Sequence, residues 1–131
     1  MFTTEFKNRI MNSIFHGTSE TLPENYYIGM STTAPSADGT GVTEPVTGSY
    51  ARVLVSSFAA SDNGLVINNG IIELPKSTDS WGTITHAVLF DGDGSDASVL
   101  WYKELANRQT IGADTTMVFQ PGELWFLLSD E

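Results

Sequence analysis

Residues 83–105 read TITHAVLFDGDGSDASVLWYKEL, a stretch typical of two β-strands joined by a polar turn. The runs Thr83–Asp91 and Val99–Leu105 are rich in β-branched, aromatic and other apolar residues. Between them, Asp91-Gly92-Asp93-Gly94 supplies aspartates and glycines, which tolerate the backbone angles of a turn. The stretch therefore predicts β structure, without the intervening helix that a parallel α/β fold would need.

The same pattern extends over most of the chain in both directions. The other candidate strands are Tyr26–Thr32, Tyr50–Phe58, Leu65–Leu74 and Thr115–Leu128, the last broken by Gln120-Pro121-Gly122. Six or seven short strands separated by turn residues favour a mainly β fold, an antiparallel β-sandwich or a jelly roll. No internal repeat or linker is visible, so residues 1–131 are predicted to form a single domain.

Residues 1–16 predict one amphipathic helix ahead of the strands. Its apolar stripe recurs about every four residues and consists of Phe2, Phe6, Ile10 and Ile14, broadened by Met11 and Phe15. Thr3 or Thr4 can cap its start, and Gly17 can end it in a left-handed conformation. A helix of this length is marginal alone in water, so we expect the stripe to pack either on the chain's own sheet or on a neighbouring subunit.

The stretch 36–49 is rich in Gly, Thr, Ser and Pro. It is too long for a tight hairpin and too polar for a core strand. We expect an exposed loop there, ordered either by the chain itself or by a partner.

The composition excludes several classes of function. The formal net charge is -10, from 16 acidic and 6 basic side chains, and the basic ones form no cluster, so nucleic-acid binding is not expected. The chain has no cysteine, which removes disulfides and thiolate chemistry and fits a reducing cytoplasm. No apolar run is long enough for a membrane helix, and the charged N-terminal stretch does not resemble a signal peptide, so neither membrane insertion nor standard export is expected.

One acidic cluster carries a candidate metal site. Asp91, Asp93 and Asp96 present alternating oxygen ligands, as the start of a calcium loop does. The pattern departs from an EF-hand loop, because the position that needs glycine holds Asp96 and the position that needs glutamate holds Tyr102. We interpret the segment as an acidic turn, with calcium binding as the alternative.

The sequence gives no support for catalysis or for a cofactor. A Ser-His-Asp arrangement would have to use His16 or His86, and both fit structural roles, one at a helix end and one inside a strand. Nucleophile-elbow, phosphate-loop and zinc-protease motifs do not occur. Two carboxylates could face each other across a cleft, but the sequence favours no particular pair. We therefore predict a protein that is not an enzyme and needs no cofactor or metal.

Adjacent aromatic residues suggest that the protein forms an oligomer. In a strand, the members of Tyr26-Tyr27 and of Trp101-Tyr102 point to opposite faces, so one of each pair faces outwards unless another layer covers it. Aromatic and arginine side chains are also enriched in protein interfaces. The candidate interface residues are Phe2, Phe6, Tyr26, Tyr50, Arg52 and Trp101.

Several segments, taken in order, resemble a family of small bacteriophage virion proteins that are described as tail-fibre or minor structural proteins. Beyond the N-terminal helix, the segments that carry the resemblance are Tyr27–Pro35, Gly48–Val53, Asn68–Pro75 and Trp81–Asp91. The resemblance implies a virion protein that is made in the host bacterial cytoplasm and binds other virion proteins. It implies no catalytic residues. Virion parts follow symmetry, so a homo-oligomer such as a trimer is expected.

Two other functions stay open at this point. A capsid decoration, or cement, protein would be equally small and acidic. A receptor- or carbohydrate-binding module would need exposed Trp or Tyr rings on which sugars could stack. The tail-fibre component is the interpretation that we carry forward.

Overall fold

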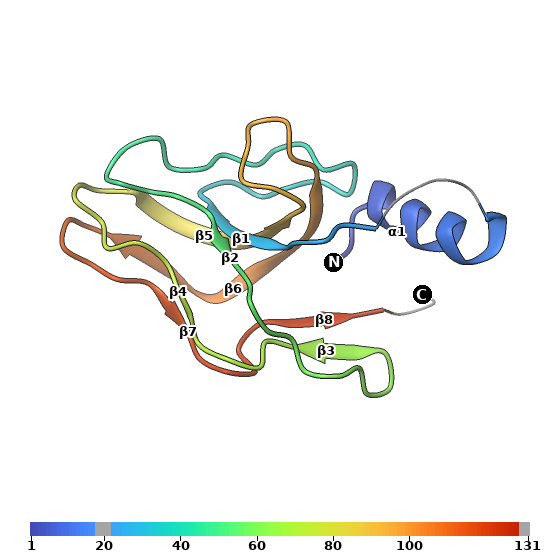
Figure 1. Cartoon of the computed structure of the whole chain (residues 1–131). Coiled ribbons are helices and arrows are strands. Elements are labelled where there is room, and N and C mark those ends of the chain that lie inside the picture. The colour runs from blue at the N-terminus through green and yellow to red at the C-terminus, as the bar shows by residue number, and fades with distance from the viewer. Residues whose placement is uncertain (18–21, 129–131) are drawn as a thin grey trace.

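The computed structural model describes residues 1–17 and 22–128, and these form a mainly β fold with one N-terminal helical segment (Figure 1). The segment consists of α1 (Thr4–Met11) and a π-helix, η1 (Asn12–His16). The strands are β1 (Tyr27–Ser31), β2 (Val53–Leu54), β3 (Leu65–Ile67), β4 (Ile72–Glu73), β5 (Gly82–Phe90), β6 (Val99–Ile111), β7 (Val118–Phe119) and β8 (Trp125–Leu127). All the strand pairings are antiparallel, so the predicted fold class is confirmed.

The first layer is a four-stranded sheet in the order β2-β1-β5-β6. Residues 84–90 of β5 are buried without a break, which means that both faces of this strand are covered. Ala87 and Leu89 belong to the core on one face. On the other face, Phe90 lies under the guanidinium group of Arg52. The loop between β1 and β2 passes over the sheet in Figure 1.

The long strand β6 bulges away from β5. Glu104 pairs with His86 and Gln109 pairs with Ile84, so the four intervening residues lie opposite Thr85 alone. The predicted strand ended at Leu105, because residues 107–110 are polar and carry no strand pattern. The strand nevertheless runs on to Ile111, since residues 82–84 of β5 supply its backbone partners.

The second layer is one narrow ribbon in two pieces. β3 pairs with β8, and β4 pairs with β7. Along the ribbon, β4 continues from β3 on one side, and β8 continues from β7 on the other. Asn68 lies at the break and is fully buried. Its amide donates to the carbonyls of Gly70 and Gln120 at 2.8 and 2.9 Å, and its carbonyl accepts from the amides of Gly122 and Leu124, both at 3.0 Å. Asn68 thus supplies the hydrogen bonds that the interrupted ribbon lacks.

The core lies between the two layers and is closed at one end by the start of the helix. Trp101 of β6 stacks on Phe126 of β8 with 4.3 Å between ring centroids. Phe2 bridges to Trp101 in extended conformation, and Phe6 is buried in the same cluster. The helix therefore packs on the chain's own sheet, one of the two arrangements expected for its stripe.

The capping residues behave as predicted. Thr3 is the N-cap and accepts a hydrogen bond from the amide of Phe6 at 3.4 Å, and Gly17 ends the segment with φ 64°. The final turn widens into a π-helix, whose larger turn puts Ile14 and Phe15 out of line with Phe6. Within the described part of the chain, no helix is long and apolar enough to span a bilayer.

Candidate interaction surfaces

The side chain of Arg52 is largely buried, and its guanidinium group bonds to other residues of the same chain. Its guanidinium group makes a bidentate pair with Glu44, with nitrogen–oxygen distances of 2.7 and 3.0 Å. It also donates to the carbonyls of Gly92 and Gly94 and lies 3.6 Å from the centre of the Phe90 ring. One side chain thus ties the loop before β2 and the acidic turn after β5 to the sheet, and charge-assisted bonds of this kind are the strong ones.

Tyr50 completes this cluster beneath the loop. Its hydroxyl donates to the Glu44 carboxylate at 2.5 Å and accepts from the amide of Met30 at 2.8 Å. Burial, followed by the hydrogen bond to Glu44, raises the pKa of the Tyr50 phenol far above its ordinary value, so the phenol stays a proton donor. Strand β1 has Gly29 at this point, because a Cβ there would lie 2.6 Å from the Tyr50 oxygen.

The loop 36–49 has no regular secondary structure and is largely exposed. Bonds within the chain nevertheless hold it, including the amide of Thr32 to the carbonyl of Thr43 and the amide of Ser36 to the carbonyl of Thr40. Together with Glu44, these contacts give the loop a defined path on the isolated chain.

The acidic turn after β5 is built around Asp91. One oxygen of Asp91 accepts from the amide of Ser98 at 2.7 Å, and the other pairs with Arg9 at 3.2 Å. Asp93 and Asp96 are both exposed. Across residues 1–17 and 22–128, no three acidic or histidine side chains are placed to share a metal ion, so the calcium hypothesis gains no support from the geometry.

His86 lies in β5 and is nearly buried. Its Nδ1 is 2.8 Å from the hydroxyl of Thr85, and desolvation lowers its pKa below the ordinary value. This environment favours the neutral ring and matches the structural role inferred from the sequence.

The six candidate interface residues are placed mostly inside the fold. Phe6 and Trp101 are buried in the core, and Phe2, Tyr26 and Tyr50 pack against it. The side chain of Arg52 is only 10% exposed. Their part in an interface stays a prediction, and any such part would be indirect, through the surfaces that they support.

The exposed apolar side chains lie elsewhere, and many of them gather at one end of the molecule. On the helical segment, Met11, Ile14 and Phe15 are 51%, 63% and 77% exposed. On the ribbon, Leu65 lies opposite Leu127, and Trp125 lies two pairs further along, on the same face as Leu127. We call these six residues the end patch; Figure 1 shows the helix and the β3–β8 ribbon projecting at the same end.

Sequence reasoning missed the ribbon half of the end patch. Residues 124–128 read LWFLL, which looks like a wholly buried strand. In a two-stranded ribbon only alternate side chains face the core, so Phe126 is buried while Trp125 and Leu127 are 43% and 46% exposed. The sequence signal for this exposed apolar surface was the unbroken apolar run. A strand with one covered face and one face in water would normally alternate apolar and polar residues.

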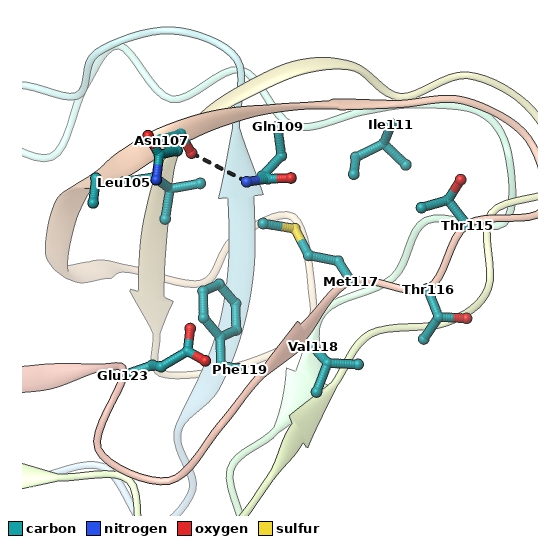
Figure 2. A pocket seen from close by; sticks show the side chains of 11 residues that line it. Leu105, Asn107, Gln109, Ile111, Thr115, Thr116, Met117, Val118, Phe119 and Glu123 are labelled. Atoms are coloured by element: carbon teal, nitrogen blue, oxygen red, sulfur yellow. Dashed lines mark hydrogen bonds between the residues drawn. The ribbon is translucent and has the colours of Figure 1, made fainter.

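A groove of about 430 Å³ lies under the bulge of β6 (Figure 2). Ile111, Met117 and Phe119 form its apolar floor, and each is at most 8% exposed. Polar side chains line its rim, among them Gln109 and Glu123, and its lining contains no basic side chain. The sequence gave no signal for this groove, since it depends on the bulge in β6.

Comparison with known proteins places nearly the whole chain in one family. A family model described as "Gp80: Podophage GP4 fiber I protein gp80" matches residues 1–126. The match covers the helix, strands β1 to β7, the groove and the first two residues of β8, and Leu127 of the end patch lies just outside it. No curated protein matches the chain.

Proposed function

Because the chain belongs to the family of the podophage GP4 fiber I protein gp80, a phage tail-fibre structural family, we propose that it is a non-enzymatic fibre component that works through protein–protein interfaces. The resemblance seen in the sequence is thereby confirmed at the level of the family. The finer proposal is that the chain forms a cyclic homo-oligomer, with three copies as the expected number, and that this oligomer binds other proteins of the tail.

The end patch is the observation that carries this proposal. Large apolar side chains that stay exposed together mark interaction sites on soluble proteins. Burying a half-exposed Ile, Leu or Phe side chain contributes about 1 kcal/mol, so six such residues can supply the centre of a stable contact. The helix and the ribbon hold the patch rigidly, since Phe6 and Phe126 anchor both in one core.

The two other functions considered from the sequence have less support. The family match favours a tail fibre over a capsid decoration protein. For sugar stacking, Trp81 and Trp101 are buried, and the exposed tryptophan, Trp125, lies within the end patch.

The test is the molar mass of the purified chain by light scattering, with Ile14→Gln/Phe15→Gln as the variant and Val46→Gln as the control. Val46 is 93% exposed and lies outside the end patch, so its substitution removes apolar surface without touching the proposed contact. We expect the wild type and the control to be oligomers, and the double variant to dissociate at concentrations at least about ten-fold higher. A monomeric wild type, or a double variant that associates as well as the control, would refute the proposal.

A further inference from the structure

The groove under the β6 bulge runs beside two strand edges without strand partners in the described part of the chain. β6 is the last strand of the four-stranded sheet, and β7 pairs with β4 alone. Edges of this kind carry backbone groups that can pair with an added strand. Since the groove lies between the two edges, an extended segment placed in it would reach both (Figure 2).

The backbone of β7 is oriented to receive such a segment. The carbonyl of Met117 accepts from the amide of Leu74 at 3.0 Å, so the backbone of Met117 faces β4. These directions alternate along an antiparallel strand. The backbone groups of Thr116 and Val118 therefore face the free edge, while the side chains of Met117 and Phe119 point into the groove in Figure 2.

The two layers differ in width on this side of the molecule. Four strands of the first layer lie over a second layer that is only two strands wide. A strand added to the free edge of β7 would widen the second layer beneath β6. Every other side chain of that strand would then contact the apolar floor, which Ile111, Met117 and Phe119 form.

At the start of β6, an extended segment of the same chain already pairs with the outer edge of the strand. The amide of Tyr102 donates to the carbonyl of Met1 at 3.0 Å, and the amide of Thr3 donates to the carbonyl of Leu100 at 2.9 Å. Residues 1–3 therefore cover the outer edge of β6 at its start, and the edge beside the groove continues from the same strand.

We propose that the groove binds an extended segment of a different virion protein, which adds as a strand to the free edge of β7. This inference rests on the proposed function as a fibre component. The charges select the partner: the groove has the carboxylate of Glu123 and no basic side chain, and the chain carries a net charge of -10. A second copy would bring further negative charge, whereas a segment with alternating apolar residues and a Lys or Arg near Glu123 is complementary.

Hydrogen exchange measured by mass spectrometry tests the occupant directly. The probes are the purified chain and the same chain within intact virions. We expect the amides of Thr116 and Val118 to exchange at least about ten-fold more slowly in virions. Equal exchange in both samples would overturn the proposal, and protection already present in the purified chain would assign the groove to a second copy instead. Absence of the chain from virions would refute the proposed function itself.

A backbone variant provides the second test. Val118→Pro removes an amide that faces the free edge, where proline is tolerated, and Val118→Ala keeps that amide. We expect both variants to fold, and Val118→Pro to enter virions at least about ten-fold less efficiently than Val118→Ala. Equal incorporation of the two would overturn the proposal. If Val118→Pro fails to fold, the exchange measurement on the wild type decides.

Discussion

At the scale of single residues, Arg52 shows how a short motif organises distant segments. Tyr50-Ala51-Arg52 reads as an ordinary strand entry, yet its two long side chains meet at Glu44 from the preceding loop. The structure shows Arg52 both paired with Glu44 and lying over the ring of Phe90. Glu44 could not be named as the partner, because the seven residues between it and Arg52 are irregular and show no periodic pattern.

Removing this guanidinium group should be costly. Arg52→Ala leaves a half-buried Glu44 without its cation, and breaking one partner of such a pair costs about 3 kcal/mol. The matched control is Arg108→Ala, on an exposed position, with a change of at most about 0.5 kcal/mol. Denaturant unfolding of both variants measures the difference. Equal stabilities would show that the Arg52 cluster is not structural.

The α-amino group of Met1 makes stability depend on pH. Burial, and then the charges of Lys103 and Lys7, lower its pKa from 8.0 to about 6. The unfolded chain therefore binds a proton at a higher pH than the folded chain does, and stability should rise as the pH rises from 6 to 8. The lowered pKa of His86 acts in the same direction at more acidic pH.

The measurement is the unfolding free energy at pH 6 and pH 8, for the wild type and for protein acetylated at its N-terminus. Acetylation removes the titrating group, so the rise should shrink in the acetylated protein. A stability that falls over this interval, or an equal rise in both proteins, would contradict the assignment.

At the scale of the elements, the sequence predicted the type of each element better than its extent. The helix, its Thr3 cap and the long strand β5 follow from local patterns, and these appear as expected. The ribbon strands came out shorter than predicted, since Asn68 and the turn at Pro121-Gly122 break their ladder. Hydrogen bonds over 52 to 56 residues of chain close that break, and no local pattern reports them.

Asn68 should therefore be the most sensitive polar residue of the ribbon. Asn68→Ala leaves the buried amide of Leu124 without its acceptor and removes one of the two acceptors of the Gly122 amide, at a cost of about 3 kcal/mol. Its neighbour Asn69 makes one exposed bond to Ser57, so Asn69→Ala should cost less than about 1 kcal/mol. Melting temperatures compare the two variants. A drop for Asn69→Ala as large as that for Asn68→Ala would rule out the closing role.

At the scale of the whole molecule, the composition shows that the protein is acidic. The fold then shows which of its apolar side chains lie on the surface. The resemblance to a family of phage virion proteins followed from ordered motifs along the chain, and the family match confirms that resemblance. The end patch and the groove could not be read from the sequence. Both depend on which face of a strand the partner layer leaves uncovered, and that is decided by contacts between distant segments.

The dependence of association on salt tests the central claim most directly, because two forces oppose each other in the proposed oligomer. Apolar contact at the end patch favours association, while a net charge of -10 on each copy disfavours it. Salt screens the repulsion and leaves the apolar term, so sedimentation velocity in 0.05 and about 0.5 M NaCl should show tighter association at the higher concentration. A chain that stays monomeric at both, or that dissociates as salt is added, would contradict an interface built on the end patch.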